Sequence, residues 1–135
     1  MERWKEAGVN VVTSLLTSGE ESELGLTSEA EIVKRTGLTY ISFPIADYSV
    51  PGSKTPMQRL ATELNDQLSR GACIGVHCRQ GIGRSSLVAA CVLVTSGETP
   101  KSAFDHIEQA RGVTVPDTIE QKEWVIAFAR DLMPN

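Results

Sequence analysis

The sequence has 135 residues, which fits a single domain over residues 1–135 and suffices to bury a core without disulfides or a metal. Its net charge of −4 lacks the basic excess that is typical of nucleic-acid binders. The apolar runs are too short for a membrane span, and no export signal opens the sequence. We therefore expect a cytoplasmic protein that binds neither nucleic acid nor membrane.

The number and spacing of cysteines and histidines argue against a fold that depends on disulfide bonds or on a structural metal. The three cysteines are Cys73, Cys78 and Cys91, and an odd number without an export signal argues against a disulfide framework. Their spacing from His77 and His106 does not match a zinc site. We expect no metal and no other cofactor.

The first half of the chain alternates helical and extended patterns. Ser28 and Glu31 have capping-box spacing, and Gly37 would end the helix that they open. Runs rich in β-branched residues predict strands on either side of this helix, and Pro44 would end the second. In chain order we expect the end of a helix over 2–7 closed by Gly8, a strand over 9–16, a polar stretch through 26, a helix over 28–37 and a strand over 38–43.

The second half continues the alternation. Thr55 would cap a helix that carries Pro56 in its first turn and ends at Gly71. A buried strand over 73–77 and a loop over 78–84 follow, then helices over 85–96 and from Thr99 to near 112, and a last helix capped by Asp117. The order favours an α/β fold with helices covering a sheet. The residues expected to face the core are Met57, Leu60, Ala61, Leu64 and Leu68 in the first of these helices, and Ile119, Trp124, Val125, Phe128 and Leu132 in the last.

The segment over residues 76–86, VHCRQGIGRSS, combines features of an anion site. It runs from a strand through a glycine-containing loop into a helix, whose first N–H groups lack internal partners and carry the positive end of the helix dipole. Gly81 and Gly83 allow successive N–H groups to face one centre, which suits a phosphate.

Cys78 and Arg84 supply the chemistry at this site. The field that binds phosphate also favours a thiolate, so Cys78 is expected to be ionised at neutral pH and to act as the nucleophile. The planar fork of Arg84 can grip two phosphate oxygens and stabilise the charge of the transition state. Ser85 could donate a hydrogen bond to the Cys78 sulfur and help the thiolate to leave.

HCRQGIGRS resembles the H-C-x5-R-S/T signature of the protein tyrosine phosphatase superfamily. The resemblance implies a dual-specificity phosphatase-like fold, a central, largely parallel mixed sheet flanked by helices on both faces, that here lacks the first strand or two. It also implies a phosphate-binding loop comprising Cys78, Arg79, Gln80, Gly81, Ile82, Gly83 and Arg84. His77 is expected to orient Cys78 from behind the loop rather than act as a base.

Asp47 is the candidate general acid, because Cys78 cannot protonate the leaving group. The other four aspartates fall on predicted helices or a helix cap, whereas Asp47 lies in a loop between Pro44 and Pro51. FPIAD, residues 43–47, is similar to the general-acid loop of dual-specificity and cyclin-dependent-kinase-associated phosphatases. The alternative role is an Asx-turn residue. Gln121 lies in a segment that resembles the family's late glutamine, which places the hydrolytic water; an exposed helix residue is the alternative.

The resemblance implies a phosphatase acting on a phosphoprotein or phosphopeptide substrate that carries phosphotyrosine. The sequence has no tyrosine-rich segment like the one that deepens the pocket of phosphotyrosine-only enzymes, so we expect a shallow pocket that also accepts phosphoserine or phosphothreonine. We expect the protein to act as a monomer. Phosphoinositide phosphatase, RNA 5′-phosphatase and non-catalytic phospho-binding module remain alternatives, and a rhodanese-like or arsenate-reducing enzyme would not need Asp47. Cys73 or Cys91 could form a disulfide with Cys78 after oxidation, but a role as buried bystanders is preferred.

Overall fold

A computed structural model describes residues 8–23, 25, 29–45, 51, 54–77, 83–111 and 118–132. Within these residues, three short parallel strands form a sheet in the order β2-β1-β3. They are β1 (Val11–Ser14), β2 (Thr39–Ser42) and β3 (Ile74–His77). Ser14 at the end of β1 is level with Ser42 of β2 and with His77 of β3, so all three strands end at one edge of the sheet. In parallel sheets this carboxyl edge is where binding sites form.

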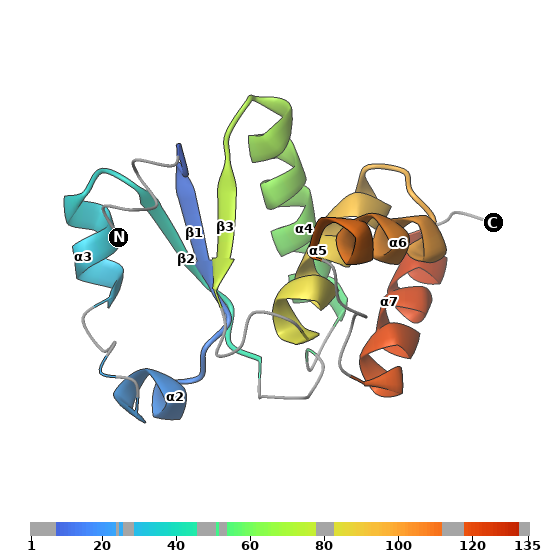
Figure 1. Cartoon of the computed structure of the whole chain (residues 1–135), viewed down its shortest axis with the longest axis horizontal. Coiled ribbons are helices and arrows are strands. Elements are labelled where there is room, and N and C mark those ends of the chain that lie inside the picture. Colours follow the sequence, from blue (N-terminus) through green and yellow to red (C-terminus); the bar gives the residue numbers. More distant parts are fainter. Residues whose placement is uncertain are drawn as a thin grey trace.

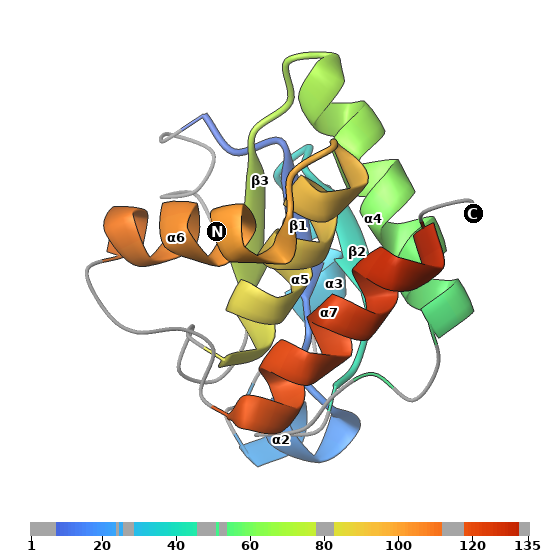
Figure 2. The same cartoon turned by 90° about the vertical axis from the view of Figure 1, so that its right-hand side faces the viewer.

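Helices lie on both sides of the sheet, as Figure 1 shows: α3 covers one face, and α4 and α5 cover the other. The helices α6 and α7 pack on α5, on the side away from the sheet (Figure 2). This arrangement confirms the predicted α/β fold. The helices are α2 (Ser18–Glu23), α3 (Glu29–Arg35), α4 (Lys54–Ser69), α5 (Gly83–Thr95), α6 (Pro100–Arg111) and α7 (Ile119–Leu132).

The core is divided by the alternation of side chains along β1. Val11 faces the larger cluster around α5, while Val12 faces a smaller cluster with Val33 and Leu38 beneath α3. Ten of the thirteen residues of α5 are buried, because this helix contacts α4, α6 and α7 as well as the sheet. The site that follows β3 is therefore mounted on the most enclosed helix of the described residues.

Two glycines end helices as predicted. Gly37 has a φ of 84° and follows α3, and the N–H of Leu38 donates to the Val33 carbonyl across it. Gly97, with a φ of 116°, ends α5 in the same way. The left-handed conformation carries little steric penalty only in a residue without Cβ, which is why the helices stop at these positions.

Several boundaries differ from the sequence prediction. The strand expected over 9–16 pairs only over Val11–Ser14, and β2 is likewise shorter than predicted. The polar stretch after β1 contains the helix α2, which was not predicted. Helix α4 begins at Lys54, one residue before the expected cap Thr55, and α5 begins at Gly83 rather than at residue 85. The expected helix over 2–7, the segment 46–50 and the loop 78–82 lie outside the described residues.

The cap of the last helix was also wrongly predicted. Asp117 lies outside the described residues, and Thr118 caps α7: its Oγ1 accepts from the N–H of Gln121 at 3.0 Å. Gln121 reciprocates, since its Oε1 accepts from the N–H of Thr118 at 3.3 Å. Ile119 was expected in the core but is 77% exposed, whereas Gln121 in the same turn of α7 is fully buried.

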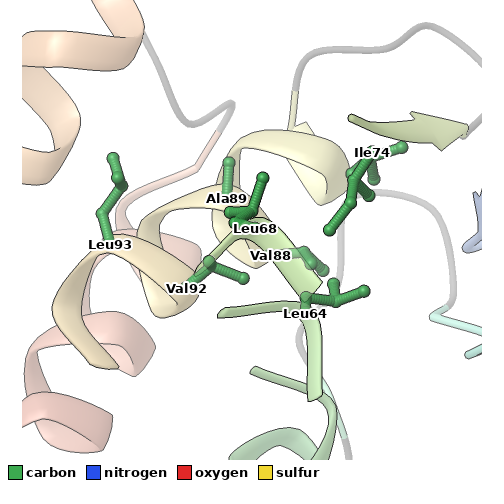
Figure 3. A pocket seen from close by; sticks show the side chains of 8 residues that line it. Leu64, Leu68, Ile74, Val88, Ala89, Val92 and Leu93 are labelled. Carbon is green, nitrogen blue, oxygen red and sulfur yellow. The ribbon is translucent and has the colours of Figure 1, made fainter. Parts of the chain in front are cut away.

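Strand β3 was predicted to be buried, yet Ile74 and Val76 are only half-buried. Within the described residues β3 pairs with β1 alone, so its other edge borders an apolar hollow between α4 and α5 (Figure 3). Leu68, predicted to face the core, lies at this hollow and is 44% exposed. The residues that line the hollow are Leu64, Leu68, Ile74, Val76, Val88, Ala89, Val92 and Leu93.

Candidate active site

Arg84 lies in the first turn of α5, directly after the loop that follows the carboxyl end of β3. Its side chain is only 2% exposed, which makes it the largest fully buried side chain among the described residues. A guanidinium stays charged at any physiological pH, so burying it requires compensating partners. Two other segments of the chain supply these partners.

The first partner is Glu20, in the short helix after β1. Its Oε1 accepts from Arg84 Nη1 at 2.6 Å, and its Oε2 accepts from Nη2 at 2.9 Å. This is a two-point, charge-assisted pair of the kind that fixes orientation as well as charge. Both side chains are nearly shielded from water, at 2% and 10% exposure for Arg84 and Glu20, so solvent screening is weak.

Glu20 is itself held by a capping box. The N–H of Glu20 donates to Thr17 Oγ1 at 3.3 Å, and the N–H of Thr17 donates back to Glu20 Oε1 at 3.1 Å. The hydrogen bond from Arg84 lowers the pKa of Glu20 from 4.5 to about 2, with help from Thr17 and against the opposing effect of burial. Glu20 is therefore an anion throughout the physiological range.

The second partner is the backbone carbonyl of Ile45, which accepts from Arg84 Nη1 at 2.8 Å. Ile45 extends the contact between the ends of β1 and β2, because its N–H donates to the Leu15 carbonyl at 3.0 Å. Arg84 thus ties together the segments that follow all three strands. Ile45 precedes the candidate acid Asp47 by two residues, so this contact anchors the stem of the segment that carries Asp47.

Two further predicted site residues are buried near helix starts. Ser85 follows Arg84 in α5, and its Oγ is buried with no hydrogen-bond partner within the described part of the chain. Gln121 is fully buried rather than exposed on the surface of its helix, and it belongs to the capping box of α7, which packs against α5. Gly83 is the first residue of α5.

The remaining predicted residues are described only in part or not at all. Residues 78–82, with Cys78, Arg79, Gln80, Gly81 and Ile82, lie outside the described residues, as does Asp47. His77 is the last residue of β3, and only its backbone is described. The structure therefore positions the two ends of the loop, β3 and the start of α5, at the carboxyl edge of the sheet.

Glu20 is the functional candidate that the sequence prediction missed. The signal was available, since Thr17 and Glu20 have the same capping-box spacing that identified the next helix. What the spacing alone does not reveal is the partner, which lies 64 residues further along the chain.

The two other cysteines differ in exposure. Cys91 is fully buried in the core, and burial raises the pKa of its thiol. This agrees with the expected role as a buried bystander. Cys73 was expected to be buried too, but it is exposed, because it precedes β3 at the amino-terminal edge of the sheet. Across the described residues, no helix has the length and apolar character needed to cross a membrane.

Comparisons with known proteins agree with this arrangement. Residues 1–98 match the family model Tc-R-P, described as "Polymorphic toxin system, DSP-PTPase phosphatase". Cyclin-dependent kinase inhibitor 3 of Homo sapiens is 30% identical over 129 residues, which cover 94% of this chain and 60% of the relative. The chain thus spans 60% of the length of that curated relative.

Comparison with solved structures also finds phosphatases among the similar folds. A kinase associated phosphatase whose catalytic site cysteine was substituted by serine matches with a TM-score of 0.88 and 28% identity, over 97% of this chain and 74% of the other. PTPMT1 in complex with PI(5)P matches with a TM-score of 0.82 at 19% identity, over 95% of this chain and 81% of the other, a likeness of fold. The predicted relationship to dual-specificity phosphatases is confirmed.

Proposed function

The chain belongs to the DSP-PTPase phosphatase family of polymorphic toxin systems, and from that premise we propose that it hydrolyses phosphomonoesters through a phosphocysteine formed on Cys78. The observation that carries this proposal is the buried Arg84 on the first turn of α5, held by Glu20 and the Ile45 carbonyl. A guanidinium fixed at a helix N-terminus, at the carboxyl edge of a parallel sheet, suits a dianionic phosphoryl group.

In the first step, the thiolate of Cys78 attacks phosphorus and the bond to the leaving-group oxygen breaks. Arg84 and the N–H groups at the start of α5 stabilise the charge on the equatorial oxygens. Asp47 gives its proton to the departing oxygen, so that an alcohol or phenol leaves rather than its anion. The products of this step are the phosphocysteine and the Asp47 carboxylate.

In the second step, water attacks the phosphocysteine and the sulfur–phosphorus bond breaks. Asp47 accepts a proton from the water, and Gln121 orients that water. The buried Ser85 hydroxyl, which has no hydrogen-bond partner within the described residues, donates to the departing thiolate and lowers its basicity. Inorganic phosphate is released, and Cys78 and Asp47 return to their starting protonation states.

We propose a phosphoprotein as the substrate, with phosphotyrosine preferred and phosphoserine or phosphothreonine accepted. The support comes from the family match and from the likeness to a kinase associated phosphatase. We further propose that the chain acts as a single domain and a monomer in the cytoplasm. Gel filtration of the reduced protein at the concentration used for kinetics tests the oligomeric state.

The test of the proposed activity is steady-state hydrolysis of an aryl phosphate across pH by the native protein and by Cys78→Ser. We expect activity in the native, reduced protein and none above background in the variant. Panels of phosphopeptides, phosphoinositides and 5′-triphosphorylated RNA then compare substrate classes under the same conditions. Absence of hydrolysis by the native protein, with phosphopeptide binding retained, would instead indicate a phospho-binding module.

A further inference from the structure

The segment that carries Asp47 is anchored at both of its ends. At its beginning, the N–H of Ile45 donates to the carbonyl of Leu15 at 3.0 Å, just after β1. At its end, Lys54 is the first residue of α4, and its Nζ lies 2.8 Å from Oδ2 of Asp131 in the last turn of α7. Figure 2 shows the start of α4 beside the end of α7. One anchor of the segment is thus a hydrogen bond to the end of β1, and the other is an ion pair with α7.

The two charges of this ion pair stand at helix ends that do not favour them. A helix carries partial positive charge at its start and partial negative charge at its end, so Lys54 is unfavourable for α4 and Asp131 is unfavourable for α7. Each charge is favourable only for the neighbouring helix, where Lys54 meets the end of α7 and Asp131 meets the start of α4. The pair therefore stabilises the contact between the two helices rather than either helix by itself.

We propose that Lys54 and Asp131 are positioning residues for the general acid, because their ion pair fixes the end of the segment that carries Asp47. The role rests on the proposed function, which assigns Asp47 as the acid. Asp47 lies seven residues before Lys54, and Pro51 between them is buried. Fixing both ends of a short segment limits the conformations of the residues between them, and the fixed φ of Pro51 limits them further. Releasing one end lowers the fraction of molecules that have the proton donor in place.

The exposure of the ion pair sets the size of the effect. The side chains of Lys54 and Asp131 are 38% and 48% exposed, so water and salt weaken their attraction, and the pair contributes little to global stability. Asp131→Asn also removes the unfavourable charge from the end of α7. We therefore expect no measurable shift of the urea midpoint in this variant and a change in catalysis of only a few fold.

The acidity of the leaving group separates the placement of the acid from other effects. Phenol is a poor leaving group whose departure depends on the proton from Asp47, whereas a dinitrophenolate departs without that proton. A displaced acid therefore slows hydrolysis of phenyl phosphate and spares dinitrophenyl phosphate. A change in the phosphate-binding loop or in the folded fraction would slow both reactions alike.

The experiment measures kcat/KM, which covers the steps up to the phosphocysteine, for both aryl phosphates at low salt. It compares the native protein with Lys54→Met, Asp131→Asn and the double variant. We expect each single variant to lose about two- to fivefold with phenyl phosphate and nothing with dinitrophenyl phosphate. The double variant should lose no more than either single variant, because all three break the same pair. Asp66→Asn is the control with native values, since it breaks an equally short ion pair with Arg70 inside α4.

Salt provides an independent readout of the same ion pair. At about 1 M salt the Debye length falls to about 3 Å, so the attraction between the exposed charges is screened in the native protein as well. We expect the difference in kcat/KM for phenyl phosphate between the native protein and Asp131→Asn to disappear under these conditions. A difference that persists unchanged at high salt would contradict an electrostatic origin.

Hydrogen exchange followed by mass spectrometry tests the anchor without catalysis. At low salt, we expect peptides spanning residues 46–53 to exchange about two- to fivefold faster in Asp131→Asn than in the native protein or in Asp66→Asn. If the native protein hydrolyses no phosphomonoester, the proposed function fails, while this exchange still decides whether the ion pair holds the segment. The proposal is overturned by native exchange in Asp131→Asn, by native kcat/KM with phenyl phosphate in the variants, or by equal losses with both aryl phosphates.

Discussion

The Glu20–Arg84 pair makes a definite prediction about how stability depends on pH. The pKa of Glu20 lies at about 2 in the folded protein, against 4.5 for the free carboxyl. A lowered acid pKa means that the unfolded chain binds the proton more readily than the folded protein does. The contribution of the ionised carboxylate is therefore fully present above pH 4.5 and is lost as pH falls toward about 2.

The magnitude follows from the same shift. One pKa unit corresponds to about 1.4 kcal/mol, so the difference amounts to about 3 kcal/mol of unfolding free energy at neutral pH. Removing one member of a buried ion pair typically costs about 3–5 kcal/mol, which agrees in size. Little reduction for solvent screening is expected, since the Arg84 and Glu20 side chains are only 2% and 10% exposed.

Urea unfolding at a series of pH values from 7 to 3 measures this dependence. Trp124, which is half-buried against the core and stacks on Phe128 with ring centroids 5.7 Å apart, serves as a fluorescence reporter. We expect Glu20→Gln to be about 3 kcal/mol less stable than the native protein at pH 7 and the two to converge as the pH falls. Glu21→Gln serves as the control. If the difference in unfolding free energy between the native protein and Glu20→Gln stays constant from pH 7 to pH 3, the lowered pKa of Glu20 does not arise from its pairing with Arg84.

Three further predictions concern other residues. Phe128→Ala should lower the unfolding free energy by about 3–5 kcal/mol in urea titrations, since Phe128 is fully buried, and a loss below 1 kcal/mol would contradict the packing. Iodoacetamide followed by peptide mass spectrometry should label Cys73 in the folded protein and Cys91 only after unfolding, because Cys91 is fully buried and its pKa is raised. The pH profile of kcat/KM should have an acidic optimum that Asp47→Asn removes, with a loss of about 10²- to 10⁴-fold; an unchanged profile would eliminate Asp47 as the acid.

The parts of the site that follow from local pattern were predictable from the sequence. The sequence predicted a strand, a loop and a helix in this order with Arg84 at the junction of loop and helix, and the structure has Arg84 in the first turn of α5. The helix ends at Gly37 and Gly97 were also predictable from the sequence. A helix often ends at a residue with a left-handed backbone conformation, and glycine adopts this conformation readily.

What the sequence could not reveal depends on contacts between distant segments. Glu20 looked like one acidic residue in a polar stretch, and only the fold brings its carboxylate to Arg84. Helical periodicity identified the apolar faces containing Leu68 and Ile119, but it carries no information about what covers them. Both residues are exposed: Leu68 lines the hollow beside β3, and Ile119 is the first residue of α7.

For Gln121 the sequence left two roles open, and the structure bears on both. A surface helix position and a site residue were both open from the sequence, and the structure has it fully buried and hydrogen-bonded to the start of its own helix. In the capping box, the side-chain Oε1 of Gln121 accepts from the N–H of Thr118, and the backbone N–H of Gln121 donates to Thr118 Oγ1. Its part in orienting the hydrolytic water remains a proposal, for which burial beside the packed α5 is the support.

The most direct test of the cysteine mechanism is to trap the intermediate. The native protein and Cys78→Ser are mixed with an aryl phosphate, quenched in acid within the first turnover and digested for mass spectrometry. We predict one phosphoryl group on the peptide containing Cys78 in the native protein, bound to the sulfur and cleaved by iodine, and none in the variant. Turnover by the native protein without a phosphorylated Cys78 peptide, or undiminished turnover by Cys78→Ser, would contradict nucleophilic catalysis by this cysteine.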